Sequence, residues 1–336
     1  MTDAAPQLPR VSIASLGGTI TMAGTTDSAG LVPTLDATDI LASAPAAREV
    51  ADLRASTLSR KPGASLRFED VLGALAWAQA QVADGADGIV LLQGTDTLEE
   101  VSYLLDLLWD RPQPLVVTGA MRAPSQLGAD GPANLLAAIV VAASPEARDR
   151  GALVVINDVV HAAARVRKVD SIAMQAFHSG PFGPLGRIAE NRAVLANHRS
   201  RPAPLPAPTA PEPNIDLVEM TLGDSGRLLR SAVDRGSDGL VIAGFGAGHV
   251  PVEALDAVAT AVSSIPVVLA SRTGAGPVLE RTYAFAGSEL DLLQRGLISA
   301  GWLDPRQARL LLWVAVANGM PRSEIAALFE QHARLP

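Results

Sequence analysis

The chain of 336 residues contains no cysteine. Without a thiol it forms no disulfide, has no cysteine nucleophile and offers no thiolate ligand to zinc. Histidines are few, and no two of them have the close spacing of a metal-binding motif; they are His161, His178, His198, His249 and His332. The sequence therefore predicts neither a metal site nor thiol chemistry.

Basic residues and long apolar runs are also scarce. Lys and Arg number 27 against 35 Asp and Glu, which gives a net charge of -8 and disfavours binding to nucleic acid or to an anionic membrane. No apolar run reaches the roughly 18 residues that a transmembrane helix needs. The first residues, MTDAAPQLPR, lack the apolar core of a secretory signal. We therefore expect a cytoplasmic protein that binds neither nucleic acid nor membrane.

Apolar residues, at 48%, are abundant and fall in short runs between helical patterns. Continuous runs of this length indicate strands buried on both faces of a parallel sheet; they lie at 11–16, 88–92, 114–118, 152–156, 239–243 and 266–270. Helical patterns lie at 68–83, 97–109, 131–143, 305–318 and 322–332. The alternation predicts an α/β fold. Asp96 and Glu99 predict a capping-box start for the helix at 97–109.

One segment interrupts this alternation. The sequence RPAPLPAPTAPEP at 201–213 has six prolines in thirteen residues, which excludes a helix or a central strand. We interpret 201–214 as a linker between an N-terminal catalytic domain, 1–200, and a C-terminal α/β domain, 215–336.

Polar segments follow several of the predicted strands. SLGGTI (15–20) carries Thr19, QGTDTLEE (93–100) carries Thr95 and Asp96, and TGAMR (118–122) ends the next strand. Because ligands bind at the carboxyl ends of parallel strands, these side chains are candidates for one site. Lys168, beyond the strand at 152–156, is a candidate base for a threonine hydroxyl if burial lowers its pKa.

Each segment also has a purely structural interpretation. Thr19, Thr95 and Asp96 can be turn or cap residues, Arg122 a partner in a surface or inter-subunit ion pair, and Lys168 an ordinary solvated lysine. A nucleotide-binding dehydrogenase is a further alternative, but the glycines at 17, 18 and 24 do not have the G-x-G-x-x-G spacing.

Taken together and in order, the segments resemble the bacterial L-asparaginases of the large two-domain kind. The resemblance rests on GGTI (17–20), QGTDTLEE (93–100), TGAMR (118–122), ADGPANL (129–135), LVVIND (153–158), Lys168, SRTGAG (271–276) and GLISAGWLDPRQARLLL (296–312). It implies a larger N-terminal flavodoxin-like parallel-sheet domain and a smaller C-terminal α/β domain. It also implies a homodimer or homotetramer, with the active site between subunits, and neither cofactor nor metal.

The resemblance also implies roles for single residues. Thr19 matches the primary nucleophile, and Thr95, Asp96 and Lys168 match a second hydroxyl–acid–lysine set. Substrate binding is implied for Gly18, Ser65, Gly94 and Ala120. The expected reaction is hydrolysis of L-asparagine through an acyl-threonine; attack by a water molecule activated by Thr95 and Lys168 is the alternative route.

Two departures from the family pattern bear on activity. The family has a tyrosine in the loop after GGTI, whereas residues 21–33 contain none, and Asp27 or Leu31 occupies the matching position. Tyr283 or Glu289 is the candidate auxiliary group. Ala247 stands where the family often has asparagine. A weakly active or non-catalytic amino-acid-binding homologue therefore remains an alternative, as does an amidase for L-glutamine or D-asparagine; the acidic charge disfavours an amidated tRNA.

Overall fold

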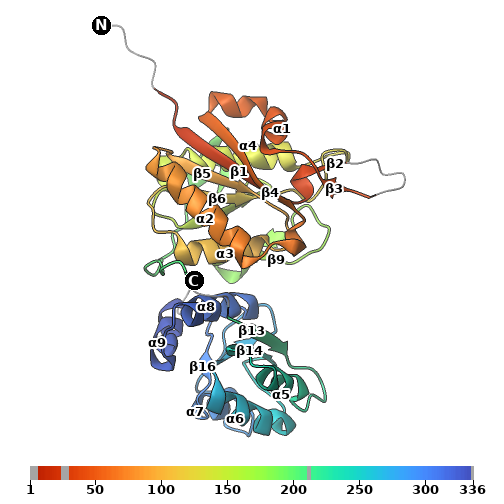
Figure 1. Ribbon diagram of the computed structural model, residues 1–336, viewed down its shortest axis with the longest axis vertical. Helices are drawn as coiled ribbons and strands as arrows, with labels where there is room; N and C mark the ends of the chain where they lie inside the picture. Colours follow the sequence, from red (N-terminus) through yellow and green to blue (C-terminus); the bar gives the residue numbers. More distant parts are fainter. Residues whose placement is uncertain (1–6, 24–29, 210–212, 334–336) are drawn as a thin grey trace. The chain divides into compact units, whose positions relative to one another are not determined.

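The computed structural model describes residues 7–23, 30–209 and 213–333. The chain divides into two compact units, Met1–Pro204 and Leu205–Pro336, and each has a parallel or mainly parallel sheet of its own (Figure 1). The division falls inside the proline-rich segment.

An eight-stranded sheet forms the core of the N-terminal unit, in the order β12-β11-β8-β7-β6-β5-β1-β4. Its strands are β1 (Arg10–Gly17), β4 (Asp52–Lys61), β5 (Gly88–Leu92), β6 (Leu115–Thr118), β7 (Ala152–Ile156), β8 (Val159–Ala162), β11 (Gly186–Ala189) and β12 (Arg192–Leu195). The strands from β4 to β7 pair in parallel, whereas β8, β11 and β12 pair antiparallel. In chain order the parallel part reads 2-1-3-4-5, which confirms the flavodoxin-like expectation.

Helices cover both faces of this sheet. Figure 1 shows α2 (Phe68–Ala83) and α3 (Leu98–Leu108) on one side, and α1 (Ala37–Ala42) and α4 (Gly131–Ala142) on the other. The apolar strands β1, β5, β6 and β7 are buried between them, as their continuous apolar sequences predicted. Pro132 lies in the first turn of α4, the position that proline favours.

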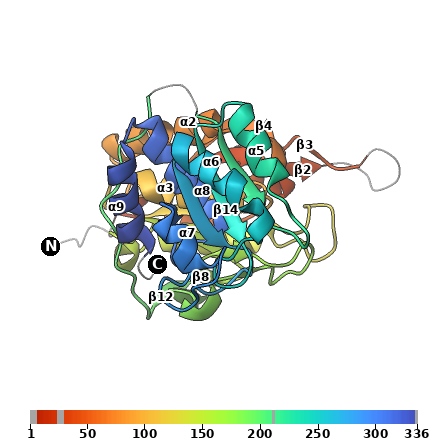
Figure 2. The ribbon, with the colours of Figure 1, turned by 90° about the horizontal axis from the view of Figure 1, so that it is seen from below.

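Two short antiparallel pairs stand outside the main sheet. One joins β2 (Met22–Ala23) to β3 (Val32–Pro33), and Figure 2 shows it projecting from the N-terminal unit. The other joins β9 (Arg167–Lys168) to β10 (Phe177–His178). Short 3-10 helices complete the unit: η1 (Thr19–Thr21), η2 (Pro45–Glu49), η3 (Gly63–Ser65), η4 (Pro145–Ala147) and η5 (Gly180–Phe182).

The C-terminal unit has a four-stranded parallel sheet in chain order. Its elements are β13 (Ile215–Glu219), β14 (Gly239–Gly244), β15 (Val267–Ser271), β16 (Ile298–Ser299), α5 (Arg227–Asp234), η6 (Val252–Ala254), α6 (Leu255–Ser264), α7 (Glu289–Gln294), α8 (Pro305–Ala317) and α9 (Arg322–Ala333). Figure 1 shows α5 and α6 below the sheet and α8 above it. The smaller α/β domain that the resemblance implied is thereby confirmed. None of the described helices is long and apolar enough to cross a membrane.

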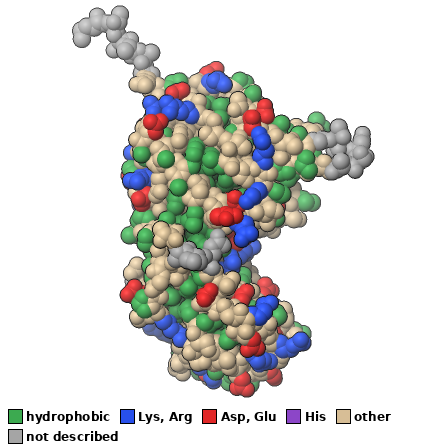
Figure 3. All heavy atoms as spheres, viewed as in Figure 1, with side chains coloured by type: hydrophobic (Ala, Val, Ile, Leu, Met, Phe, Trp, Pro, Cys, Tyr) green, Lys and Arg blue, Asp and Glu red, His purple; other side chains and the backbone are tan. Residues whose placement is uncertain are grey.

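The surface charge follows the composition. On the face drawn in Figure 3, the described acidic and basic side chains are interspersed over each unit. That face shows no extended basic patch of the kind that nucleic-acid-binding proteins present.

Candidate active site

The strand order places a reversal point beside β1. The chain moves from β1 to β4 on one side and continues from β5 on the other, and ligands bind at such a reversal, outside the carboxyl ends of the strands. The turn after β1 carries Thr19, and the loop after β5 carries Thr95. Both predicted hydroxyls therefore follow strands that flank the reversal point.

Glycines bring these loops into backbone contact. A Cβ atom on Gly18 would lie 2.1 Å from both Cα and N of Gly94, and one on Gly94 would lie 2.7 Å from the Gly63 nitrogen. Gly18 also has φ 84° and ψ -172°, a combination that only glycine readily adopts. Thr19 and Thr95 are each the next residue after one of two touching glycines, so the backbone packing holds their loops together.

Lys168 completes a cluster with the loop after β5, which carries Thr95. Its Nζ donates to Thr95 Oγ1 at 2.9 Å and to Asp96 Oδ1 at 3.3 Å. The lysine side chain is only 15% exposed, whereas that of Asp96 is 61% exposed. The solvated-lysine interpretation is therefore wrong. Asp96 pairs with the amine while its own side chain stays mostly exposed.

Two hydrogen bonds from Thr21 close the turn that carries Thr19. Thr21 is buried, and both its N–H, at 2.9 Å, and its Oγ1, at 2.8 Å, donate to the Gly18 carbonyl. Thr19 is half-buried, and its own hydroxyl has no hydrogen-bond partner among the residues that the structure describes. An oxygen so placed is available to a substrate.

The helix after Thr95 departs from the capping-box prediction. The N-cap of α3 is Thr97, and no side chain caps the helix. Thr97 Oγ1 instead donates to the Gly63 carbonyl at 2.9 Å, which connects η3 to the loop that carries Thr95. Glu99 Oε2 accepts the main-chain N–H of Lys168 at 2.5 Å. The cap interpretation of this segment was wrong because its polar groups bind neighbouring loops.

The remaining substrate-binding candidates lie on two supporting loops. Ser65 ends η3 and is exposed. Ala120 is fully buried, in a loop that Asn134 and Asp130 hold. Asn134 Nδ2 donates to the Gly119 carbonyl at 2.9 Å, and the Asp130 carboxylate accepts the N–H groups of Met121 and Arg122. Asn134 lies in the ADGPANL segment but was not among the predicted site residues.

Arg122 Nη1 donates to the main-chain carbonyls of Leu127 at 3.2 Å and Gly128 at 3.3 Å.

The two auxiliary candidates lie in the C-terminal unit and differ in availability. Glu289 is fully buried; its Oε1 accepts the N–H groups of Thr282 and Tyr283, and its Oε2 contacts His249 Nε2 at 3.1 Å. Burial alone would raise the pKa of Glu289, but these hydrogen bonds hold it below its ordinary value. Tyr283 is 43% exposed and packs edge-on against the His249 ring. Glu289 therefore braces the segment that presents Tyr283.

The two departures from the family pattern lie at positions 27 or 31 and at position 247. Asp27 lies outside the described residues, and Leu31 is half-buried. Ala247 accepts the N–H of Leu279 through its carbonyl at 3.0 Å.

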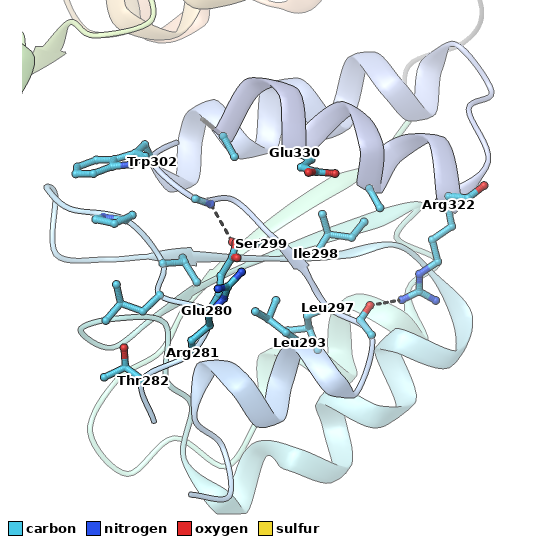
Figure 4. A pocket seen from close by; sticks show the side chains of 18 residues that line it. Glu280, Arg281, Thr282, Leu293, Leu297, Ile298, Ser299, Trp302, Arg322 and Glu330 are labelled. Atoms are coloured by element: carbon cyan, nitrogen blue, oxygen red, sulfur yellow. Dashed lines mark hydrogen bonds between the residues drawn. The ribbon is translucent and has the colours of Figure 1, made fainter. Parts of the chain in front are cut away.

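The C-terminal unit has a groove of its own. It measures about 1380 Å³ and lies among α7, β16 and α9 (Figure 4). Arg322 at its rim bonds the Gly296 and Val262 carbonyls, and no predicted site residue lines it. Among the described residues, no group of three or more His, Cys, Asp or Glu is arranged to hold a metal ion.

Comparison with known proteins decides the family. Residues 10–201 match the family described as "Asparaginase, N-terminal", and residues 214–329 match the "Glutaminase/Asparaginase C-terminal domain". The chain belongs to the asparaginase family. The expected class, an asparaginase-type amidohydrolase, is thereby confirmed.

Individual relatives in the asparaginase family match along almost their whole length. The chain is 37% identical to a "Probable L-asparaginase" of Deinococcus radiodurans, over 96% of this chain and 98% of the relative. It is 32% identical to "L-asparaginase 2" of Escherichia coli, over 98% and 95%. A crystal structure of a "Probable Cytoplasmic L-asparaginase" from Campylobacter jejuni superposes with a TM-score of 0.86 at 30% identity, over 96% of this chain and 99% of that one.

Proposed function

We propose that the protein hydrolyses L-asparagine to L-aspartate and ammonia, with Thr19 as the nucleophile. The observation that carries the proposal is the contact of Lys168 Nζ with Thr95 Oγ1 and Asp96 Oδ1, beside the turn of Thr19. The names of the Deinococcus and Escherichia relatives support the choice of asparagine as the substrate.

Substrate positioning follows from the polar groups of these loops. Asp96 accepts the substrate α-ammonium group and Ser65 binds the α-carboxylate. The N–H groups near Gly94 and Thr95 face the amide oxygen, and the carbonyl of Ala120 accepts from the leaving amide. Holding the amide beside Thr19 makes the attack effectively intramolecular. One oxyanion donor is worth about 2.7–4 kcal/mol in the transition state.

The reaction proceeds in two steps. The Thr19 oxygen attacks the amide carbon, the C–N bond breaks, and the hydroxyl proton leaves with the nitrogen as ammonia. A water molecule then attacks the acyl-threonine, gives its hydroxyl to the carbon and returns a proton to Thr19. A threonine hydroxyl needs an adjacent base, and the Thr95–Lys168 pair relays the proton. In the alternative route the same pair activates water directly, without an acyl-enzyme.

Ammonia release from L-asparagine tests the proposal. Thr19→Ala, Thr95→Ala and Lys168→Met should each lose most of the activity while remaining folded. Lys61→Met is the matched control, because Lys61 is the only other lysine in the chain and its amine binds Asp70. Wild-type turnover in Thr19→Ala would exclude the nucleophile role. Mass spectrometry of rapidly quenched enzyme should detect an acyl adduct on Thr19, and its absence under burst conditions would favour the direct-water route.

The same assay separates the alternatives. Turnover of L-glutamine above that of L-asparagine would make the protein a glutaminase, which the description of its C-terminal domain accommodates. Turnover of D-asparagine above that of L-asparagine would make the protein an amidase for the D-amino acid. A protein that binds L-asparagine and releases no ammonia would be the non-catalytic homologue.

The auxiliary group, the assembly and the location complete the proposal. Tyr283 carries the available hydroxyl and assists Thr19 of another subunit, so Tyr283→Phe should lower kcat without changing the fold. We expect a homodimer or homotetramer, which light scattering of the purified protein would measure. We also expect no cofactor requirement. We expect a cytoplasmic location, which the name of the Campylobacter relative supports and cell fractionation would measure.

A further inference from the structure

The strand that carries Lys168 has little support of its own. β9 is two residues long, lies outside the main sheet and pairs only with β10, at two positions. A ladder of this size is marginal in water. The lysine side chain itself loses rotamer entropy when it is fixed. Something else must therefore hold the Lys168 backbone where its amine can reach Thr95.

Glu99 supplies that support. Its residue is 7% exposed, and its Oε2 accepts the Lys168 N–H at 2.5 Å. Short bonds to an ionised acceptor are about twice as strong as neutral ones. Glu99 lies in the first turn of α3, where the helix dipole stabilises a carboxylate.

Three bonds to Lys168 come from one stretch of chain, and Asp96, which accepts from the amine at 3.3 Å, lies between the other two acceptors. Thr95 holds the amine at 2.9 Å, and Glu99, four residues later, holds the main-chain nitrogen. The lysine is thus gripped at both its backbone and its tip by the segment that starts α3. Movement of that segment carries the acceptor hydroxyl and the lysine together.

We propose that Glu99 is a positioning residue that acts through Lys168: its buried carboxylate sets the distance from the lysine amine to the Thr95 hydroxyl. The inference rests on the proposed function, in which Lys168 relays a proton. Because a misplacement of about 1 Å can cost about 10²-fold in rate, loss of this bond should lower kcat strongly. KM should change little, because Glu99 is buried.

The test compares Glu99→Ala with the milder Glu99→Gln, which keeps an acceptor oxygen of nearly the same reach. We expect kcat to fall by roughly 10–100-fold in Glu99→Ala, and by less in Glu99→Gln, with circular dichroism unchanged. Glu69→Gln is the matched control: Glu69 holds the same first-turn position in α2 but is exposed and paired with Arg67. Should Glu99→Ala fail to fold, the Glu99→Gln variant carries the comparison.

A double-variant cycle distinguishes positioning from general stability. If Glu99 acts through Lys168, Glu99→Ala should cause no further loss of residual activity in the Lys168→Met background. If Glu99 serves only the fold, Glu99→Ala should lower kcat per active site equally in the wild-type and Lys168→Met backgrounds, or in neither of them. Either result overturns the inference. If Lys168→Met keeps full turnover, the proposed function is wrong, and the inference that rests on it is wrong as well. If Lys168→Met is inactive while Glu99→Gln and Glu99→Ala turn over normally, only the inference is wrong.

Discussion

Replacing Gly18 by alanine should separate the two threonine loops. The new Cβ would lie 2.1 Å from the backbone of Gly94, whereas ordinary van der Waals contact begins at 3.4 Å. The backbones must therefore move apart by about 1.3 Å, the difference of these two distances. Neither contact atom belongs to a flexible side chain, so rotation of a side chain cannot relieve the overlap.

The expected cost of Gly18→Ala has a stability part and a rate part. The conformation at φ 84° and ψ -172° costs a residue other than glycine about 1–3 kcal/mol. Displacement of Thr19 by more than about 1 Å from the second loop should lower kcat/KM by about 10²-fold. Gly94→Ala, whose Cβ overlaps Gly63, should also reduce activity.

Denaturant unfolding and ammonia release on the same preparations measure both parts. Gly236→Ala is the control, since Gly236 has φ 82° but a methyl group added to it would meet no atom within 4 Å. That control should lose about 1–2 kcal/mol with unchanged turnover. Wild-type kcat/KM in folded Gly18→Ala would refute the claim that glycine contact aligns the loops.

Two further predictions concern buried charge. His161 is buried, and burial, together with repulsion from His178, lowers its pKa from 6.5 to about 4. As the pH falls, the unfolded chain therefore binds a proton at this histidine before the folded chain does. The stability from neutral His161 is complete above pH 6.5 and is lost as the pH falls toward 4, a loss of about 3 kcal/mol. Urea unfolding of His161→Gln should accordingly show a flatter pH dependence of the free energy of unfolding. Asp106 binds Arg199 at 2.7 Å and Arg201 at 3.3 Å, with its own side chain 2% exposed, so Asp106→Asn should cost about 3–5 kcal/mol in thermal or denaturant unfolding; an unchanged midpoint would show that the arginines find other partners.

The central strands could be predicted from sequence because burial on both faces demands an apolar run. The predicted runs at 88–92 and 152–156 coincide with β5 and β7, and 68–83 coincides with α2. β4 escaped prediction because it lies at the edge of the sheet, where its residues, DLRASTLSRK, are exposed or half-buried. An edge strand of this kind has no apolar run to detect.

Strand positions alone predict only part of the site. Thr19 and Thr95 follow parallel strands, so the strand-end rule brings them to one edge. Lys168 follows no parallel strand of the sheet, and its contact with Thr95 spans 73 positions in the sequence, so its place in the site was predicted from the resemblance to the asparaginases. The role of Glu99 was not predicted, because a glutamate in a first helical turn has the same sequence pattern whether it caps its helix or binds another strand.

Two separate devices therefore assemble the site, and they should be separable by experiment. Backbone contact between Gly18 and Gly94 aligns the two threonine loops, whereas the Glu99 carboxylate aligns Lys168. Independent perturbations add in free energy and coupled ones do not. The losses in log kcat from Gly18→Ala and Glu99→Ala should accordingly add in the double variant, while those from Glu99→Ala and Lys168→Met should not. A double variant of Gly18 and Glu99 no slower than the worse single variant would mean that one device positions both groups.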